Sequence, residues 1–406
     1  MSGRFSPADI ACMQEALALA ARARYRCHPN PQVGCVIVRD GQVVGRGYHQ
    51  RRGGPHAEVY ALREAGDRAR GATVYVTLEP CSHYGLTPPC ADALIAAGVA
   101  RVVAAMTDPD PRVAGQGLAR LRAAGIQVEV GLLEAEARAL NRPWLHWIAH
   151  RRPYVLLKAG LSLDGKIAAA SGESRWITGE AARAHAHQVR DQVDAILVGI
   201  GTVLQDNPAL TARPPAPGPL ALGWDLPAPV RHSPALAWAE DLGPWQPRHP
   251  LRVILDSLGR TPLTAAALPA LVAVTPAAPR ERIAALEAAG AEVLVLPADR
   301  NGVVSLPPLL EELGRRGVVS LLVEGGGQVH WSFLAERLAG GALFYLAPRL
   351  LGGRSAPGAV AGPGFRRLAE APRLRQPVVE PVGDDLLIVG DLEYPAAAQG
   401  AETEGA

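Results

Sequence analysis

The chain has 406 residues, enough for two domains that each bury a core. Its 41 lysine and arginine residues against 39 acidic residues leave almost no net charge, which argues against a DNA or RNA partner. The first residues lack the apolar segment of a secretory signal, and no run is apolar over the roughly 18 residues that span a bilayer. An odd count of five cysteines suits a reducing compartment. We therefore expect a cytoplasmic protein with neither nucleic acid nor a membrane as partner.

The first 150 residues alternate between helical and strand patterns. Asp40-Gly41 between two apolar runs is a strong signal for a β-hairpin. The expected elements are a helix over 9–24, hairpin strands over 33–38 and 43–48, a helix from His56 to about Gly66, a strand over 73–78, a helix over 91–97, and strands over 101–106 and 126–130. This order predicts a three-layer α/β module.

A domain boundary is expected where two X-Pro steps, Arg142-Pro143 and Arg152-Pro153, disfavour a continuous helix. We place the first domain at 1–149 and the second at 150–396. Residues 397–406 are expected to form a disordered tail.

The second half again alternates strands with helices, which predicts a mostly parallel sheet. Strands are expected over 154–159, 195–199, 252–256, 271–274, 292–296 and 318–324, helices over 179–190, 278–289 and 307–316, and a late strand, antiparallel in one alternative, over 386–390. The proline-rich stretch from Pro208 to Pro250 contains an insertion at about 214–250, which we expect to be a solvated loop without a binding role.

A candidate metal site is encoded by His56-Ala57-Glu58, Pro80-Cys81 and Cys90 in chain order. Each piece alone is weak, since two cysteines can also be small buried apolar residues. Together they give three ligands and one open position on a tetrahedral zinc ion, as in catalytic zinc sites. Glu58 then serves as general acid and base for the bound water, in the pattern described for zinc deaminases.

The eight residues between the two cysteines, Ser82 to Pro89, contain a glycine and two prolines. We expect an ordered loop at the pocket mouth that influences which substrate fits. His83 on this loop either meets the substrate or is a solvated histidine, and the sequence leaves both open.

Polar and glycine-rich segments follow several strands of the second half. Glu324-Gly325-Gly326-Gly327 follows an apolar run and offers backbone amides to phosphate, although a tight turn is an equal alternative for this motif alone. Similar segments follow other strands, at 158–167, 199–208 and 256–257. Since ligands bind at the carboxyl ends of strands in such sheets, we expect a nucleotide cofactor site without the Rossmann fingerprint.

Taken together, these motifs resemble the bifunctional riboflavin-biosynthesis deaminase–reductase family over nearly the whole chain. The resemblance implies an N-terminal cytidine-deaminase-like three-layer α/β/α domain and a C-terminal dihydrofolate-reductase-like α/β domain. It implies zinc-dependent deamination of 2,5-diamino-6-(5-phosphoribosylamino)pyrimidin-4-one, followed by NADPH reduction of the ribosyl side chain to a ribityl chain. One zinc ion per chain and NADPH are the implied cofactors, and a homo-oligomer through the reductase domain is expected.

The resemblance also assigns roles to individual residues. The zinc ligands are His56, Cys81 and Cys90, and Glu58 is catalytic. Contacts to NADPH are implied for Leu161, Trp176, Thr202, Asp206, Ser257, Gly326, Gly327 and Gln328. Contacts to the two substrates are implied for Asn30, His49, His83, Lys158, Ser174, Arg190, Leu210, Arg213 and Glu324. The guanidinium groups of Arg190 and Arg213 suit the phosphate, and Lys158 and Asp206 are the candidate proton donors of the reduction.

Two alternatives stay open at this point. One is a nucleoside or tRNA deaminase fused to an unrelated reductase-like domain, which the near-zero charge and the eight-residue gap between the cysteines disfavour. The other is a binding module in which zinc only stabilises the fold. Glu58 distinguishes this second alternative from a catalytic site, because a structural zinc site does not need a neighbouring carboxylate.

Overall fold

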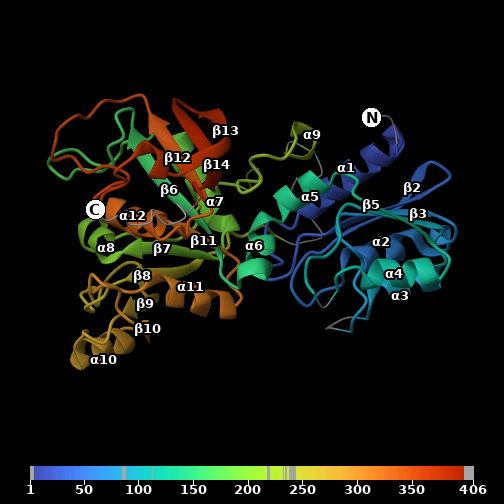
Figure 1. Ribbon diagram of the computed structural model, residues 1–406, viewed down its shortest axis with the longest axis horizontal. Helices are drawn as coiled ribbons and strands as arrows, with labels where there is room; N and C mark the ends of the chain where they lie inside the picture. Colours follow the sequence, from blue (N-terminus) through green and yellow to red (C-terminus); the bar gives the residue numbers. More distant parts are fainter. Residues whose placement is uncertain are drawn as a thin grey trace, which may run out of the picture.

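The computed structural model describes residues 4–84, 88–111, 113–216, 220–231, 233, 236 and 244–396. These residues form two sheets, each with its own helices, which lie side by side along the long axis of the molecule (Figure 1). Within the described ranges, no helix is both long enough and apolar enough to cross a membrane. The expected disordered tail, 397–406, falls outside these ranges.

The first sheet has five strands in the order β2-β1-β3-β4-β5, with β1 antiparallel to both of its neighbours and the remaining pairs parallel. The hairpin expected at Asp40-Gly41 is confirmed, and both residues have positive φ, which suits the tight turns of β-hairpins. The strands are β1 (Gly34–Arg39), β2 (Gln42–Tyr48), β3 (Thr73–Val76), β4 (Arg101–Ala104) and β5 (Gln127–Val130).

Helices cover both faces of this sheet, as the three-layer expectation requires. Helix α1 packs on one face together with α5, while α2, α3 and α4 pack on the other (Figure 1). The elements are α1 (Pro7–Ala21), α2 (Ala57–Ala65), the 3-10 helix η1 (Gly66–Ala69), α3 (Cys90–Ala97), α4 (Gln116–Ala123) and α5 (Glu134–Leu140).

Two strand glycines allow these helices to approach the sheet closely. A Cβ at Gly34 would lie 1.9 Å from the carbonyl oxygen of Ala16 in α1, and one at Gly47 would lie 2.1 Å from that of Ala57 in α2. Any larger residue would push α1 or α2 away from the sheet. The second contact matters for function, because α2 begins next to His56.

The second sheet has nine strands in the order β10-β9-β8-β7-β11-β6-β12-β14-β13. The pairs from β10 through β12 are parallel, and β14 is antiparallel to β12 and β13, which confirms a mostly parallel sheet with an antiparallel end. Two of these strands, β12 and β13, were not predicted. The strands are β6 (Tyr154–Ser162), β7 (Ala195–Gly199), β8 (Leu251–Leu255), β9 (Leu271–Val274), β10 (Glu292–Val295), β11 (Ser320–Val323), β12 (Gly341–Ala347), β13 (Arg373–Val382) and β14 (Asp385–Glu393).

The helices of the second half agree with the expected ones where periodicity was clear. The segment after β7, which we expected to be a polar loop, instead forms a short helix that carries Thr202 and Asp206. The elements are α7 (Glu180–Gln192), α8 (Ile200–Asp206), α9 (Ala228–Arg231), α10 (Arg280–Ala288), α11 (Leu306–Arg315), α12 (Gly327–Ala335) and the 3-10 helix η4 (Leu368–Glu370).

The segment between the two sheets differs from the expectation that its prolines disfavour a continuous helix. Residues Arg142–His150 form helix α6, and Pro143 lies in its first turn, where the missing N–H leaves no hydrogen bond unmade. The helix ends at His150, its C-cap residue Arg151 has positive φ, and β6 begins at Tyr154. The linker is therefore an ordered helix, and the boundary after residue 149 stays a prediction.

The proline-rich insertion is not a solvated loop in its described part, so that expectation was wrong. Leu222, Trp224 and Val230 are buried and belong to the same apolar cluster as the residues of α1. The guanidinium of Arg142 in α6 lies 4.4 Å from the Trp224 ring, and Arg24 after α1 donates to the carbonyl oxygen of Leu236 at 2.6 Å. The insertion therefore packs between the two halves, where Figure 1 places α9.

Candidate active sites

A first pocket, of about 300 Å³, lies in the N-terminal half. Its wall comes from several distant segments: the turn around Asn30, the start of α2, the loop after β3, the loop after β4 and helix α6. All seven residues that we assigned to the deaminase site fall in or next to it. Six of them line the cavity directly, namely Asn30, His49, His56, Glu58, Cys81 and His83, and Cys90 contacts His56.

The three expected metal ligands converge. His56 is the N-cap residue of α2, Cys81 follows β3, and Cys90 is the first residue of α3. Their ligand atoms all lie within 4.8 Å of one another, with His56 Nδ1 3.6 Å from Cys81 Sγ and 3.3 Å from Cys90 Sγ. One imidazole and two sulfurs at this spacing form a donor set that suits a tetrahedral zinc ion with one open position.

The electrostatics of this cluster favour a thiolate at Cys81. A hydrogen bond from the Cys90 thiol, together with donors from His56 and the Cys90 backbone, outweighs the effect of burial and lowers the pKa of Cys81. The Cys90 N–H donates to Cys81 Sγ at 3.3 Å from the first turn of α3. A thiolate is the form that binds metal.

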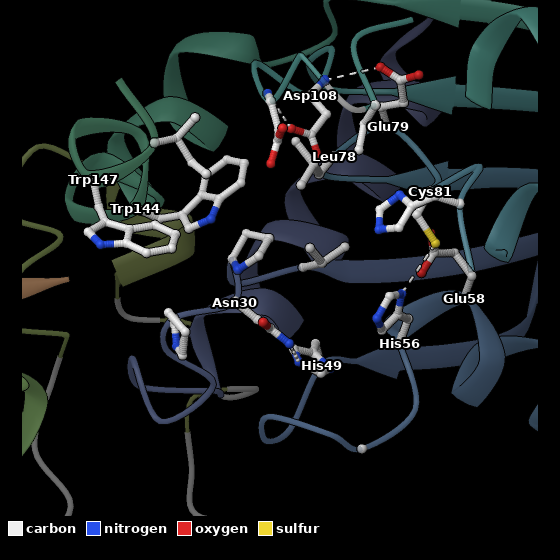
Figure 2. Close-up of a pocket in the computed structure, with 18 of the residues that line it drawn as sticks. Asn30, His49, His56, Glu58, Leu78, Glu79, Cys81, Asp108, Trp144 and Trp147 are labelled. Atoms are coloured by element: carbon white, nitrogen blue, oxygen red, sulfur yellow. Dashed lines mark hydrogen bonds between the residues drawn. The ribbon is translucent and has the colours of Figure 1, made fainter. Parts of the chain in front are cut away.

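Glu58 lies in the first turn of α2 and is 3% exposed. Burial raises the pKa of Glu58, and the nearby His56 partly offsets this effect. Figure 2 shows its carboxyl group beside His56 and Cys81. A buried carboxyl with a raised pKa next to a metal-ligand set is suited to accept a proton and release it again.

Asn30 and His49 form a pair on the pocket wall. His49 Nδ1 lies 3.0 Å from the carbonyl oxygen of Pro55, so this nitrogen carries the proton. His49 Nε2 then accepts from Asn30 Nδ2 at 3.0 Å. Burial lowers the pKa of His49, which favours this neutral form. The pair fixes the orientation of the Asn30 amide at the pocket wall (Figure 2).

Several residues of this pocket were missed by the sequence analysis. Glu79 accepts from the backbone N–H groups of Asp108, Gly115 and Gly117 at 3.1, 2.9 and 2.9 Å, and so ties the loop after β4 to the metal loop. Its partners are backbone amides distant in sequence, which no residue pattern marks. Asp108, Asp110, Trp144 and Trp147 also line the cavity.

A second pocket, of about 810 Å³, lies in the C-terminal half near the carboxyl ends of β6, β7 and β11. Ten of the residues assigned to cofactor or second substrate line it: Lys158, Ser174, Trp176, Arg190, Thr202, Asp206, Leu210, Arg213, Glu324 and Gly326. Its position agrees with the expectation that strand ends form the crevice.

Four assigned residues lie outside the lining of this cavity. Leu161 is buried in β6, and Ser257 Oγ accepts from the Val304 N–H at 3.1 Å. Gly327 packs so closely that a Cβ there would lie 2.6 Å from the carbonyl oxygen of Gly358. Gln328 is exposed at the start of α12. Their roles toward NADPH stay predictions.

A charged cluster forms part of the second pocket. Glu324 accepts from Arg190 Nε and Nη2 at 2.7 and 2.8 Å, and from Lys158 Nζ at 3.2 Å. Burial would raise the pKa of Glu324, but the charges of Arg190 and Lys158 outweigh it and hold the pKa well below its usual range. The carboxylate is therefore ionised whenever the protein is folded at neutral pH.

This cluster changes the expectation for the two arginines. The third guanidinium nitrogen of Arg190, Nη1, lies 3.3 Å from the carbonyl oxygen of Thr211, so all three nitrogens have protein acceptors. Arg213 is exposed at the same pocket. Arg213 is therefore better placed than Arg190 to grip a substrate phosphate.

Comparison with known proteins gives matches for both halves. Residues 7–106 match the family model of the cytidine and deoxycytidylate deaminase zinc-binding region, and residues 153–388 match that of the RibD C-terminal domain. The riboflavin biosynthesis protein RibD of Escherichia coli is 45% identical over 381 residues, which cover 93% of this chain and 97% of that protein. RibD of Bacillus amyloliquefaciens is 41% identical over 92% of this chain and 94% of its own length.

Solved structures agree with these sequence matches. Acinetobacter baumannii RibD superposes with a TM-score of 0.79 at 39% identity, covering 95% of this chain and 99% of that one. A Thermotoga maritima protein described as a diaminohydroxyphosphoribosylaminopyrimidine deaminase and 5-amino-6-(5-phosphoribosylamino)uracil reductase gives 0.76 at 32% identity, with the same coverage. The expected fold class, a cytidine-deaminase-like domain followed by a reductase domain, is confirmed.

Proposed function

Because the chain belongs to the family of bifunctional deaminase–reductases of riboflavin biosynthesis, we propose that it catalyses two consecutive reactions on a phosphorylated pyrimidine. The N-terminal half hydrolyses an amino group from the pyrimidine ring. The C-terminal half then reduces the ribosyl side chain to a ribityl chain. The Thermotoga maritima relative is described by these two activities. The single observation that carries the proposal is the His56–Cys81–Cys90 donor set beside the buried carboxyl group of Glu58.

The first pocket fits a zinc ion, because an imidazole and two thiol groups within 4.8 Å can share one tetrahedral ion. When bound, the ion supplies the Lewis acidity that lowers the pKa of a water molecule from about 15.7 to about 7. Glu58 would take one proton from the attacking water and deliver it to the ring nitrogen, and would then take the second proton from the added hydroxyl group and deliver it to the amine, which leaves as ammonia. Asn30, oriented by His49, holds the pyrimidine edge, and His83 contacts the substrate from the pocket mouth.

We propose that the second pocket, a cavity of about 810 Å³ with the exposed Arg213 in its lining, binds a dinucleotide together with a substrate phosphate. NADPH, when bound, supplies the hydride, and the protein mainly orients it. Gly326 is the N-cap of α12, whose first amides can bind a cofactor phosphate, and Thr202 and Asp206 face the same cavity. Arg213 grips the substrate phosphate. Lys158, held by Glu324, donates the proton of the reduction, with Asp206 as the alternative donor.

The remaining assignments concern partners and location. The near-zero net charge supports a small phosphorylated pyrimidine, and not a nucleic acid, as the substrate. The five cysteines are free in the structure, and two of them must stay reduced to hold a metal, which supports the cytoplasm as the location. Association of copies through the reductase domain remains part of the proposal.

The test couples both activities on the diaminopyrimidine phosphate. Ammonia release and the loss of NADPH absorbance are followed together with the zinc content of the protein. Replacing Cys81 by Ser should lower the zinc content and abolish deamination, while NADPH-dependent reduction of the deaminated intermediate continues. An enzyme that ignores the phosphorylated pyrimidine but deaminates cytidine, or adenosine in tRNA, would disprove the proposed substrate.

A further inference from the structure

The wall of the first pocket is attached to the C-terminal half of the chain. His28, two residues before Asn30, has a side chain that is 3% exposed, and its Nδ1 lies 2.7 Å from Asp194 Oδ2. Asp194 belongs to the other half, between α7 and β7. A hydrogen bond with a carboxylate is among the stronger ones in proteins, and here it joins two residues from different halves of the chain that are 166 positions apart.

Asp194 is itself held rigidly. Its carboxylate accepts from the backbone N–H groups of Val319 and Ser320 at 3.1 and 3.0 Å, and from Arg248 Nη1 at 3.0 Å. Burial would raise the pKa of Asp194, but its bond with His28 and the charge of Arg248 outweigh it and hold the pKa well below its usual range. His28 therefore binds to an ionised group that is fixed directly before β7 of the second sheet.

Two further contacts attach the same wall. The ring of Pro29 lies against the turn after α11, where a Cβ at Gly317 would be 3.5 Å from Pro29 Cγ. Trp147 of α6 donates from Nε1 to the carbonyl oxygen of Gly314 at 2.9 Å. Pro29 and Trp147 both line the first pocket. Figure 2 shows Asn30 between the indoles of Trp144 and Trp147 on one side and His56 and Cys81 on the other.

The turn formed by residues 27–30 links the position of His28 to that of Asn30. The Asn30 N–H donates to the carbonyl oxygen of Cys27 at 3.0 Å, and Cys27 Sγ donates to the Asn30 carbonyl oxygen at 3.4 Å, so the four residues form one compact unit. Because the His28 side chain points to Asp194 while Asn30 lines the cavity, anchoring the first residue orients the second.

We propose that His28 is a positioning residue for deamination, which sets the orientation of Asn30 through its hydrogen bond to Asp194 of the reductase half. The deaminase pocket is thus completed by the domain that performs the other reaction. This inference rests on the proposed function, since it assigns a purpose to Asn30 in substrate binding.

The test is kinetic and uses the full chain. His28→Ala removes the hydrogen bond and leaves Asp194 with four other donors, namely the backbone N–H groups of Val319 and Ser320, the Ser320 hydroxyl group and Arg248 Nη1. We expect KM for deamination to rise about tenfold, with kcat, zinc content and reductase rate within about twofold of the parent enzyme. His28→Asn, whose amide nitrogen can take the place of Nδ1, should restore most of the affinity. His249→Ala, which removes an exposed histidine of the reductase half, serves as the matched control and should change nothing.

A second variant guards against a folding defect in the first. Trp147→Phe keeps an aromatic ring at the pocket wall but loses the N–H that reaches Gly314, and it should raise KM about threefold. An unchanged KM in zinc-loaded His28→Ala overturns the proposal, and so does an equal loss of both activities. A parent enzyme that fails to deaminate the diaminopyrimidine phosphate contradicts the proposed function instead, which is a separate result.

Discussion

The two pockets differ in how they are assembled. In the first, the metal donor set comes from 35 consecutive residues, since His56 and Cys90 are 34 positions apart, while the lining of the cavity of about 300 Å³ runs from Pro29 to Ile148. In the second, the lining runs from Lys158 to Tyr345 around a cavity of about 810 Å³. Metal binding restricts residue type and spacing strongly, whereas a cofactor crevice is built mainly from backbone and strand ends. The residues of the first kind of site can therefore be predicted from a sequence. For the second kind, only the approximate location can be predicted.

The largest expected effect is the loss of one activity, deamination, without any change in the other. Glu58→Gln keeps the size of the side chain but removes the proton acceptor, so deamination should fall by about a factor of a thousand, within the range for loss of a general acid–base group. Zinc content and reductase rate should stay at the parent level. Ammonia release, metal analysis and NADPH oxidation on the deaminated intermediate measure the three quantities. A variant with full deaminase activity would show that Glu58 has no part in the chemistry.

A smaller effect tests the assignment within the second pocket. Arg213→Ala removes an exposed guanidinium from the cavity, and KM for the phosphorylated intermediate in the reduction should rise about tenfold. Deamination should not change. The same intermediate without its phosphate separates the causes, because its KM should be equal in the parent and the variant. A variant that loses affinity for both forms alike would mean that Arg213 does not bind phosphate.

The smallest effect concerns stability in acid. The pKa of Glu324 is lowered in the folded protein, so its contribution to stability is complete above the unfolded value of about 4.3 and is lost as pH falls through the folded value. Glu324→Gln should therefore be less stable than the parent protein at neutral pH, and this difference should shrink as pH falls below about 4. Urea unfolding from about pH 6 to about pH 3 measures it. A difference that is constant over this range would mean that Glu324 is not stabilised as an anion.

Much of the fold could be predicted because its signals are local. The hairpin at Asp40-Gly41, the helix that begins after His56 and the strand at 195–199 each depend on a turn signal or on apolar periodicity, and the structure confirms all three. The metal ligands could be predicted for a similar reason, since their residue types and order are constrained by chemistry.

The errors fall where long-range packing overrides a local rule. The X-Pro step at Pro143 predicts an interruption of helical structure, but a proline in the first turn of a helix costs no hydrogen bond. The lack of periodicity around Trp224 predicts a solvated loop, yet Trp224 is 5% exposed and its ring contacts Arg142. Neither the burial of the insertion nor the bond between His28 and Asp194 leaves a pattern in the sequence, because the partners are far apart along the chain.

The buried insertion has a consequence for how the gene can be divided. Arg24 donates to the carbonyl oxygen of Leu236, and the guanidinium of Arg142 lies over the Trp224 ring. Leu236 and Trp224 are far from these arginines in the sequence. A chimera made by joining two homologous genes at the linker would combine α1 and α6 from one protein with the insertion from the other. The side chains at this interface would then not be complementary. A stable chimera therefore requires that α1, α6 and residues 220–236 come from the same parent sequence.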